Sequence, residues 1–164
     1  HAPAIFSVIE HALEDAGSGI KMLHIVRETS QMIREFFPDV HAVGILGTTG
    51  TFITRQYDAM AGEGLTITNL SDSSQEILHR AIYSKKFGLK SNNSPYSKAG
   101  KLVELAADEL IEKGAELIVL GCTELPMAFQ GRTYKGIALI DASLALARAL
   151  IRDYAPEKLR PLNF

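Results

Sequence analysis

Apolar and polar residues follow two repeating patterns along the chain. Apolar residues that recur every three or four positions predict helices, from Ile5, Phe6, Ile9 and Leu13 near the amino terminus to residues 143–151 near the other end. Between the helices lie short apolar runs, and the run at 41–46 shows no polar alternation, which is typical of a strand covered on both faces. These runs predict strands at 20–25, 41–46, 65–70, 116–120 and 137–140. The alternation predicts an α/β fold with three α/β/α layers around a parallel sheet.

Two unusual loops follow predicted strands directly. The loop at 47–51 (GTTGT) follows the strand at 41–46, and the loop at 121–124 (GCTE) follows the strand at 116–120. Open α/β sheets bind their ligands at the carboxyl ends of their strands, so both loops are candidate site elements.

Helices are expected after both of these loops. The helix after 47–51 should carry Ile53, Tyr57 and Met60 on its inner face, and a short helix should follow Pro126. The segment 88–100 is rich in Ser, Asn, Gly and Pro and is expected to be a surface insertion or a lid.

Composition narrows the possible functions. The chain has 164 residues, of which 46% are hydrophobic, so it is long enough to bury one globular core. Lys and Arg total 17 against 19 for Asp and Glu, which gives a net charge of −2 and argues against a nucleic-acid partner. Its apolar runs are shorter than the ~20 residues that span a membrane, and its amino terminus does not resemble a secretion signal. We therefore expect a cytoplasmic protein with a small, anionic ligand and no membrane partner.

Cys122 is the only cysteine, which excludes an internal disulfide framework and an all-cysteine metal site. Its place between a strand and a predicted helix amino terminus favours a reactive thiolate, while a buried hydrophobe is an equally good interpretation. Glu124 would raise the pKa of the thiol if the two side chains lie close together. The histidines lack metal-ligand spacing with one another and with Cys122, so no metal site is expected.

The loop at 47–51 combines backbone N–H groups with hydroxyl donors, which suits it to hold a carboxylate. A tight turn with threonines that cap the next helix explains the same residues equally well. The loop lacks the Gly-Lys-Ser/Thr of a nucleotide-binding P-loop, so no nucleotide cofactor is expected.

Three stretches resemble motifs of the aspartate/glutamate racemase family. Residues 116–126 (ELIVLGCTELP) closely resemble its second catalytic motif, in which a strand delivers a Gly-Cys-Thr-Glu-[hydrophobic]-Pro turn. Residues 43–51 (VGILGTTGT) resemble the strand and Thr-rich loop that open its second lobe, and residues 137–143 (IALIDAS) resemble the strand after the second cysteine. The motifs occur in the right order, and the pattern is closer to the amino-acid racemase branch with aspartate-racemase-like spacing than to the glutamate racemases of cell-wall synthesis.

This resemblance implies a site and an activity. It implies cofactor-independent racemisation of a small amino acid, with Cys122 as a catalytic acid/base. The substrate contacts that it implies are Thr48, Thr49, Thr51, Thr123 and Lys86, of which Lys86 would meet a side-chain carboxylate. Members of the family are commonly homodimers.

The first motif of the family, a strand that ends in Cys-Asn-Thr-Ala and often His, is absent, and His1 falls where the residue after that Ala would be. The resemblance therefore implies an amino-terminal truncation. Residues 1–40 would be the remaining helix, strand and helix of the first lobe, residues 41–140 the second lobe, and residues 141–164 a helix and tail that pack back toward the first.

The missing motif bears directly on activity. Racemisation removes the Cα proton on one face and returns a proton on the other, so it needs two acid/base groups. We therefore expect the chain as given to be inactive as a racemase, and to bind a small carboxylate or exchange the Cα proton on one face. The alternatives are a hydantoin racemase, a maleate isomerase or a decarboxylase of the same family, or a non-catalytic carboxylate-binding homologue.

Overall fold

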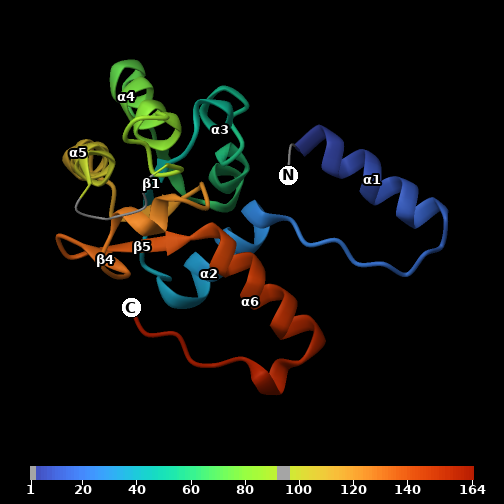
Figure 1. Ribbon diagram of the computed structural model, residues 1–164. Coiled ribbons are helices and arrows are strands. Elements are labelled where there is room, and N and C mark those ends of the chain that lie inside the picture. Colours follow the sequence, from blue (N-terminus) through green and yellow to red (C-terminus); the bar gives the residue numbers. More distant parts are fainter. Residues whose placement is uncertain (1–2, 92–96) are drawn as a thin grey trace.

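A computed structural model describes residues 3–91 and 97–164 and confirms the α/β prediction (Figure 1). The sheet has five strands in the order β2-β1-β3-β5-β4. Their bounds are β1 Ala42–Leu46, β2 Thr66–Thr68, β3 Leu117–Leu120, β4 Thr133–Tyr134 and β5 Ile137–Asp141. The first four strands of this order are parallel, and β4 pairs antiparallel with β5 at one edge.

Helices cover both faces of the sheet. The α-helices are α1 Pro3–Asp15, α2 Ile25–Phe36, α3 Thr49–Ile53, α4 Asp72–Tyr83, α5 Lys98–Glu112 and α6 Ala142–Tyr154. Three short 3-10 helices are η1 Asp58–Glu63, η2 Leu125–Ala128 and η3 Pro156–Lys158. Helices α4 and α5 lie on one face, and α2 and α6 lie on the other (Figure 1).

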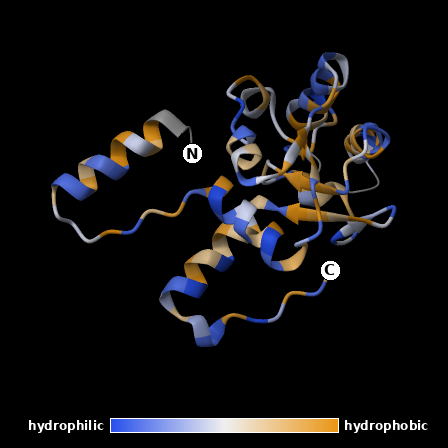
Figure 2. Cartoon of the chain, turned by 180° about the vertical axis from the view of Figure 1, so that it is seen from behind, coloured by the Kyte–Doolittle hydropathy of each residue, from blue (hydrophilic) through white to orange (hydrophobic). Residues whose placement is uncertain are grey.

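The central strand β3 shows why the sheet is buried on both faces. All four of its residues are buried, and they alternate between the two cores. Ile118 and Leu120 belong to the core under α4 and α5, whereas Leu117 and Val119 belong to the core under α2 and α6. Figure 2 shows the same concentration of hydrophobic residues in the strands at the middle of the body.

The strand predicted at 20–25 is wrong. Helix α1 and the segment that follows it extend away from the sheet, and Ile20 is 64% exposed (Figures 1 and 2). The segment is not part of the sheet in the described chain, so it does not form a strand. Its last residue instead begins α2, because the Nδ1 atom of His24 accepts a hydrogen bond from the backbone N–H of Val26 at 3.2 Å and caps the helix.

The helix predicted after the 47–51 loop is shorter than expected. Helix α3 begins inside that loop and ends at Ile53, and Arg55 then adopts a φ of +49° that turns the chain into η1. Tyr57 and Met60 are buried as predicted, but Ile53 is 71% exposed because the helix does not continue. The helix predicted after Pro126 is the single 3-10 turn η2.

The segment 88–100, predicted as a surface insertion or a lid, lies partly outside the described residues, because 92–96 are not among them. His1 also lies outside the described residues. Among the helices described, none combines the length and the apolar character needed to cross a membrane.

Helix α5 packs closely on the sheet because β1 has a glycine beneath it. A Cβ atom added at Gly44 would lie 3.0 Å from Cδ1 of Leu110 and 3.1 Å from Cβ of Ala115.

We therefore expect Gly44→Ala to lower the free energy of unfolding by about 1–3 kcal/mol through overpacking. Urea unfolding measures this loss. The control is Gly131→Ala, where an added Cβ has no neighbour within 4 Å, and its expected change is about 0.5 kcal/mol or less. Equal unfolding midpoints for the two variants would contradict this packing argument.

Helices α4 and α5 are joined by the carboxylate of Glu109, which accepts a hydrogen bond from the backbone N–H of Ser71 at 2.7 Å and pairs with Lys113 at 2.7 Å. Partial burial acts to raise the pKa of Glu109, but these donors outweigh it and hold the pKa at about 2. Because the pKa is depressed in the folded state, the stabilisation is fully present above the ordinary value and is lost as the pH falls toward about 2.

We expect Glu109→Gln to lower the free energy of unfolding at pH 7 by about 1–3 kcal/mol, because charged hydrogen bonds are lost. The difference from the wild type should shrink as the pH falls from 5 to about 2. Urea unfolding over this pH range measures the difference. A difference that stays constant with pH would refute the role assigned to the carboxylate.

Candidate active site

The carboxyl ends of three neighbouring parallel strands lie at the same level and position the loops of the candidate site. The register places Leu46 of β1 beside Leu120 of β3, and Leu120 beside Asp141 of β5. The backbone N–H of Gly121 then donates to the carbonyl of Leu46 at 2.7 Å, so the turn that carries Cys122 lies against the start of the threonine loop.

Gly121 is required for this close approach. A Cβ atom at that position would lie 3.0 Å from Cε2 of Tyr57 and 3.2 Å from the carbonyl oxygen of Leu46. The absence of a side chain lets Tyr57 pack directly beneath the cysteine turn. A side chain at position 121 would be crowded by both the Tyr57 ring and the backbone of Leu46, so glycine is favoured there.

Cys122 is half-buried and bonded within its own turn. Its Sγ donates to Oε2 of Glu124 at 3.0 Å, and the hydroxyl of Thr123 donates to the same oxygen at 2.9 Å. The other oxygen of Glu124, Oε1, lies 3.7 Å from Nζ of Lys90. Glu124 therefore links the thiol to a cation from a different part of the chain.

This environment favours the protonated thiol. Burial and the hydrogen bond to Glu124 together raise the pKa of Cys122 to about 11. The pKa of Glu124 is held below its usual range, first by the hydrogen bond from Cys122 and also by that from Thr123. The expectation that a helix amino terminus would favour a thiolate is wrong, because only the four-residue turn η2 follows.

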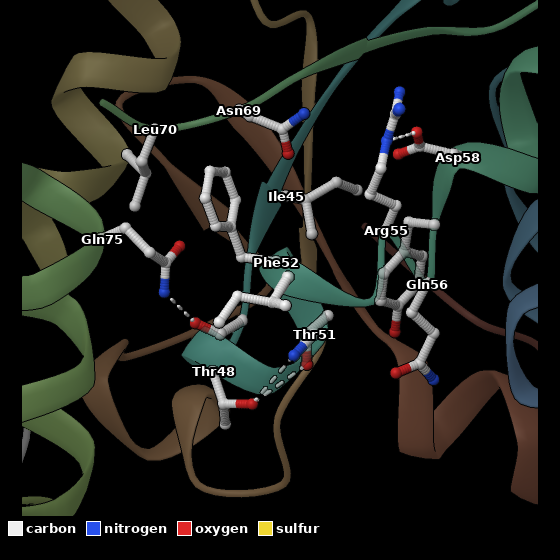
Figure 3. Close-up of a pocket in the computed structure, with 13 residues that line it drawn as sticks. Ile45, Thr48, Thr51, Phe52, Arg55, Gln56, Asp58, Asn69, Leu70 and Gln75 are labelled. Carbon is white, nitrogen blue, oxygen red and sulfur yellow. Dashed lines mark hydrogen bonds and ion pairs between the residues drawn. The ribbon is translucent and has the colours of Figure 1, made fainter. Parts of the chain in front are cut away.

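The threonine loop serves mainly to begin α3. Oγ1 of Thr48 accepts a hydrogen bond from the backbone N–H of Thr51 at 3.3 Å and lies 3.2 Å from the hydroxyl of Thr51. Nε2 of Gln75, on α4, donates to the carbonyl of Gly47 at 3.0 Å and holds the loop from the other side (Figure 3). The capping interpretation is thus confirmed, and both threonines also line a pocket.

That pocket has a volume of about 450 Å³ and lies between α3, the end of β2 and α4 (Figure 3). Thr48 and Thr51 lie on its wall with the apolar side chains of Phe52 and Leu70 and with the amide of Gln75. A mixed wall of this kind suits a small polar ligand.

The predicted site residues do not all lie together in the structure. Thr48 and Thr51 line the pocket, whereas Cys122 and Thr123 share the carboxylate of Glu124 outside its wall. Thr49 is the first residue of α3 and is not part of the pocket wall. Lys86 is exposed on the turn after α4 and forms no ion pair within the described chain, whereas Lys90, which is also exposed, pairs with Glu124.

Sequence reasoning did not single out Lys90 or Tyr57 as site residues. Lys90 lies in the segment predicted as a lid, and no motif marks it. Tyr57 was predicted only as a core residue; its pKa is raised by burial and then by the charges of Asp141 and Cys122. The described residues contain no group of three or more His, Cys, Asp or Glu side chains that could hold a metal ion.

After burial, the carboxylate of Glu124 is the main cause of the raised pKa of Cys122. We expect Glu124→Gln to lower the pKa of the thiol, because the variant removes both the negative charge and a hydrogen bond to the neutral form. Alkylation by iodoacetamide at pH 8 should accelerate about tenfold for each unit by which the pKa falls. Mass spectrometry measures the rate, and Glu112→Gln, at the exposed end of α5, is the matched control. An unchanged alkylation rate in Glu124→Gln would show that the carboxylate does not affect the pKa of the thiol.

Comparison with known proteins places the chain in a family. The sequence pattern of the Asp/Glu/hydantoin racemase family matches residues 8–150. An uncharacterised protein encoded in the pnlA 3′ region of Pectobacterium carotovorum subsp. carotovorum is 31% identical over 111 residues, which are 67% of this chain and 69% of that protein.

Two solved structures share the fold. The crystal structure of an aspartate racemase homologue from Pyrococcus horikoshii OT3 matches with a TM-score of 0.66 and 25% identity, over 88% of this chain and 62% of that one. The aspartate racemase of Picrophilus torridus matches with a TM-score of 0.61 and 21% identity, over 80% of this chain and 52% of that one. The chain thus spans 52–62% of the length of these two proteins.

Proposed function

Because the chain belongs to the Asp/Glu/hydantoin racemase family, we propose that it forms part of an enzyme that racemises aspartate, glutamate or a related small amino acid without a cofactor. The observation that carries this proposal is the position of Cys122. Its thiol is hydrogen-bonded to Glu124 in the turn that follows a buried parallel strand, beside a donor-rich loop.

In the proposed reaction, Cys122 acts on one face of the substrate Cα. In one direction the thiolate removes the Cα proton and becomes a thiol. In the other direction the thiol donates its proton to the carbanion, whose electron pair forms the new C–H bond and leaves a thiolate. A pKa of about 11 suits the second role at neutral pH, because the group is then almost entirely protonated.

The threonines supply donors for the substrate in this proposal. Thr48 and Thr51 would hold the α-carboxylate from the pocket wall, and Thr123 would contact it from the cysteine turn. Such donors stabilise the negative charge that develops as the Cα proton leaves. Thr49 and Lys86 stay predictions from the resemblance, because neither is part of the pocket wall.

A second acid/base must act on the opposite face, and Cys122 is the only cysteine in the 164 residues. We therefore propose that this polypeptide, taken alone, exchanges the Cα proton of one enantiomer and does not invert it. After abstraction, the thiol exchanges its proton with solvent and returns solvent hydrogen to the same face.

Proton NMR in D₂O tests this proposal. We expect loss of the Cα proton signal from one enantiomer of aspartate, glutamate or a related amino acid, without inversion, at a rate that rises with pH as the thiol ionises. Cys122→Ala should reduce the exchange by at least about 100-fold.

The matched variant is Cys122→Ser, which keeps the shape of the side chain and should also lose the exchange, because a hydroxyl is a far weaker acid than a thiol. Exchange that persists in Cys122→Ala, or no exchange by the wild type across a panel of amino acids, would refute the proposal.

A further inference from the structure

The turn after α4 is built to fix the backbone at Lys90. The N–H of Gly88 donates to the carbonyl of Ser84 at 2.7 Å, and the N–H of Lys90 itself donates to the carbonyl of Ile82 at 3.2 Å. Leu89 between them is 2% exposed and is anchored in the core under α4 and α5. The segment predicted as a lid therefore begins as a rigid turn.

A glycine is the only residue that fits the middle of this turn. A Cβ atom at Gly88 would lie 2.6 Å from the backbone N and O of Ser84 and 2.8 Å from the carbonyl of Ile82. These neighbours are backbone atoms, so they cannot move aside as a flexible side chain would. The chain path that leads to Lys90 depends on this glycine.

The side chain of Lys90 lies between two partners. Its Nζ is 4.3 Å from the centroid of the Tyr83 ring and 3.7 Å from Oε1 of Glu124. The Tyr83 ring in turn stacks on His79, with 4.7 Å between the ring centroids. Lys90 is thus held over an aromatic face and lies beside the carboxylate that accepts the hydrogen bond of Cys122.

We propose that Lys90 is a positioning residue for Cys122, which it acts on through the carboxylate of Glu124. This inference rests on the proposed acid/base role of Cys122. Oε1 of Glu124 faces Lys90, which leaves Oε2 for the thiol and for the hydroxyl of Thr123.

The charge balance gives the reason. When Cys122 gives its proton to a carbanion, a thiolate is left about 3 Å from the Glu124 carboxylate. Without Lys90, this would bring two negative charges together in a half-buried turn. With Lys90, the group of three carries a single net negative charge, so the thiolate costs less to form.

Other charged or titratable groups face the cysteine turn from the opposite side. The Tyr57 side chain packs beneath Gly121, and its pKa is raised by burial and by the charges of Asp141 and Cys122. Tyr57 and Asp141 supply no positive charge. Lys90 is the one cation among the groups that we identify around Cys122 in the described chain.

The test is the pH profile of Cys122 alkylation by iodoacetamide in three variants. Lys90→Met should move the profile to higher pH and slow alkylation at pH 8 about fivefold. Lys90→Arg keeps the charge and should restore the wild-type profile. Lys85→Met removes an equal charge from an exposed position of the same turn and should leave the profile unchanged.

The outcomes separate this inference from the proposed function. An unchanged profile in Lys90→Met, or an equal shift in Lys85→Met, would overturn the role of Lys90 even if the wild type exchanges the Cα proton. A wild type without exchange would refute the proposed function, while the alkylation profile would still measure the effect of Lys90. Thermal unfolding checks that each variant is folded, and Lys90→Gln replaces Lys90→Met if the latter unfolds.

Discussion

The alignment of parallel strand ends is the constraint on which the candidate site depends. Leu46, Leu120 and Asp141 end three neighbouring strands at the same level, and the hydrogen bond from Gly121 to Leu46 carries this alignment into the loops. Because these strands are buried on both faces, their ends cannot shift without disturbing both hydrophobic cores. The threonine loop and the cysteine turn are therefore held together by the packing of the whole sheet.

The two loops at these strand ends, the threonine loop and the cysteine turn, have different roles. The threonine loop, braced by Gln75, presents donors toward a pocket, whereas the cysteine turn directs its polar groups at Glu124. The proposed enzyme needs both, because orienting a carboxylate and moving a proton at Cα are distinct requirements. Lys90 connects the second task to α4, the helix that also braces the first through Gln75.

The sequence predicted the fold best where apolar residues form an unbroken run or recur with a helical period. The runs at 41–46 and 116–120 became β1 and β3 because buried parallel strands are continuously apolar. The run at 20–25 is also largely apolar, but it pairs with no strand of the described chain, and an apolar run alone does not predict such pairing. Likewise, the periodicity of Tyr57 and Met60 gave their burial correctly, while the left-handed Arg55 that ends the helix before them has no signature in the pattern.

Within the site, short-range chemistry could be predicted and long-range chemistry could not. Glu124 was suspected of raising the pKa of Cys122 because the two residues are neighbours in sequence. Lys90 is 34 positions away from Glu124, and only the tertiary structure brings it to that carboxylate. The same limit explains why Lys86, carried over from a motif, lies exposed while a lysine four residues later reaches the site.

The protonated state of Cys122 also bears on how the chain tolerates oxidants. Peroxide attacks a thiolate rather than a thiol, and the first product is a sulfenic acid. A cysteine whose pKa is about 11 presents very little thiolate at neutral pH, although its side chain is only half-buried. Burial and the Glu124 carboxylate, which together raise the pKa of Cys122, thereby also protect its sulfur from oxidation.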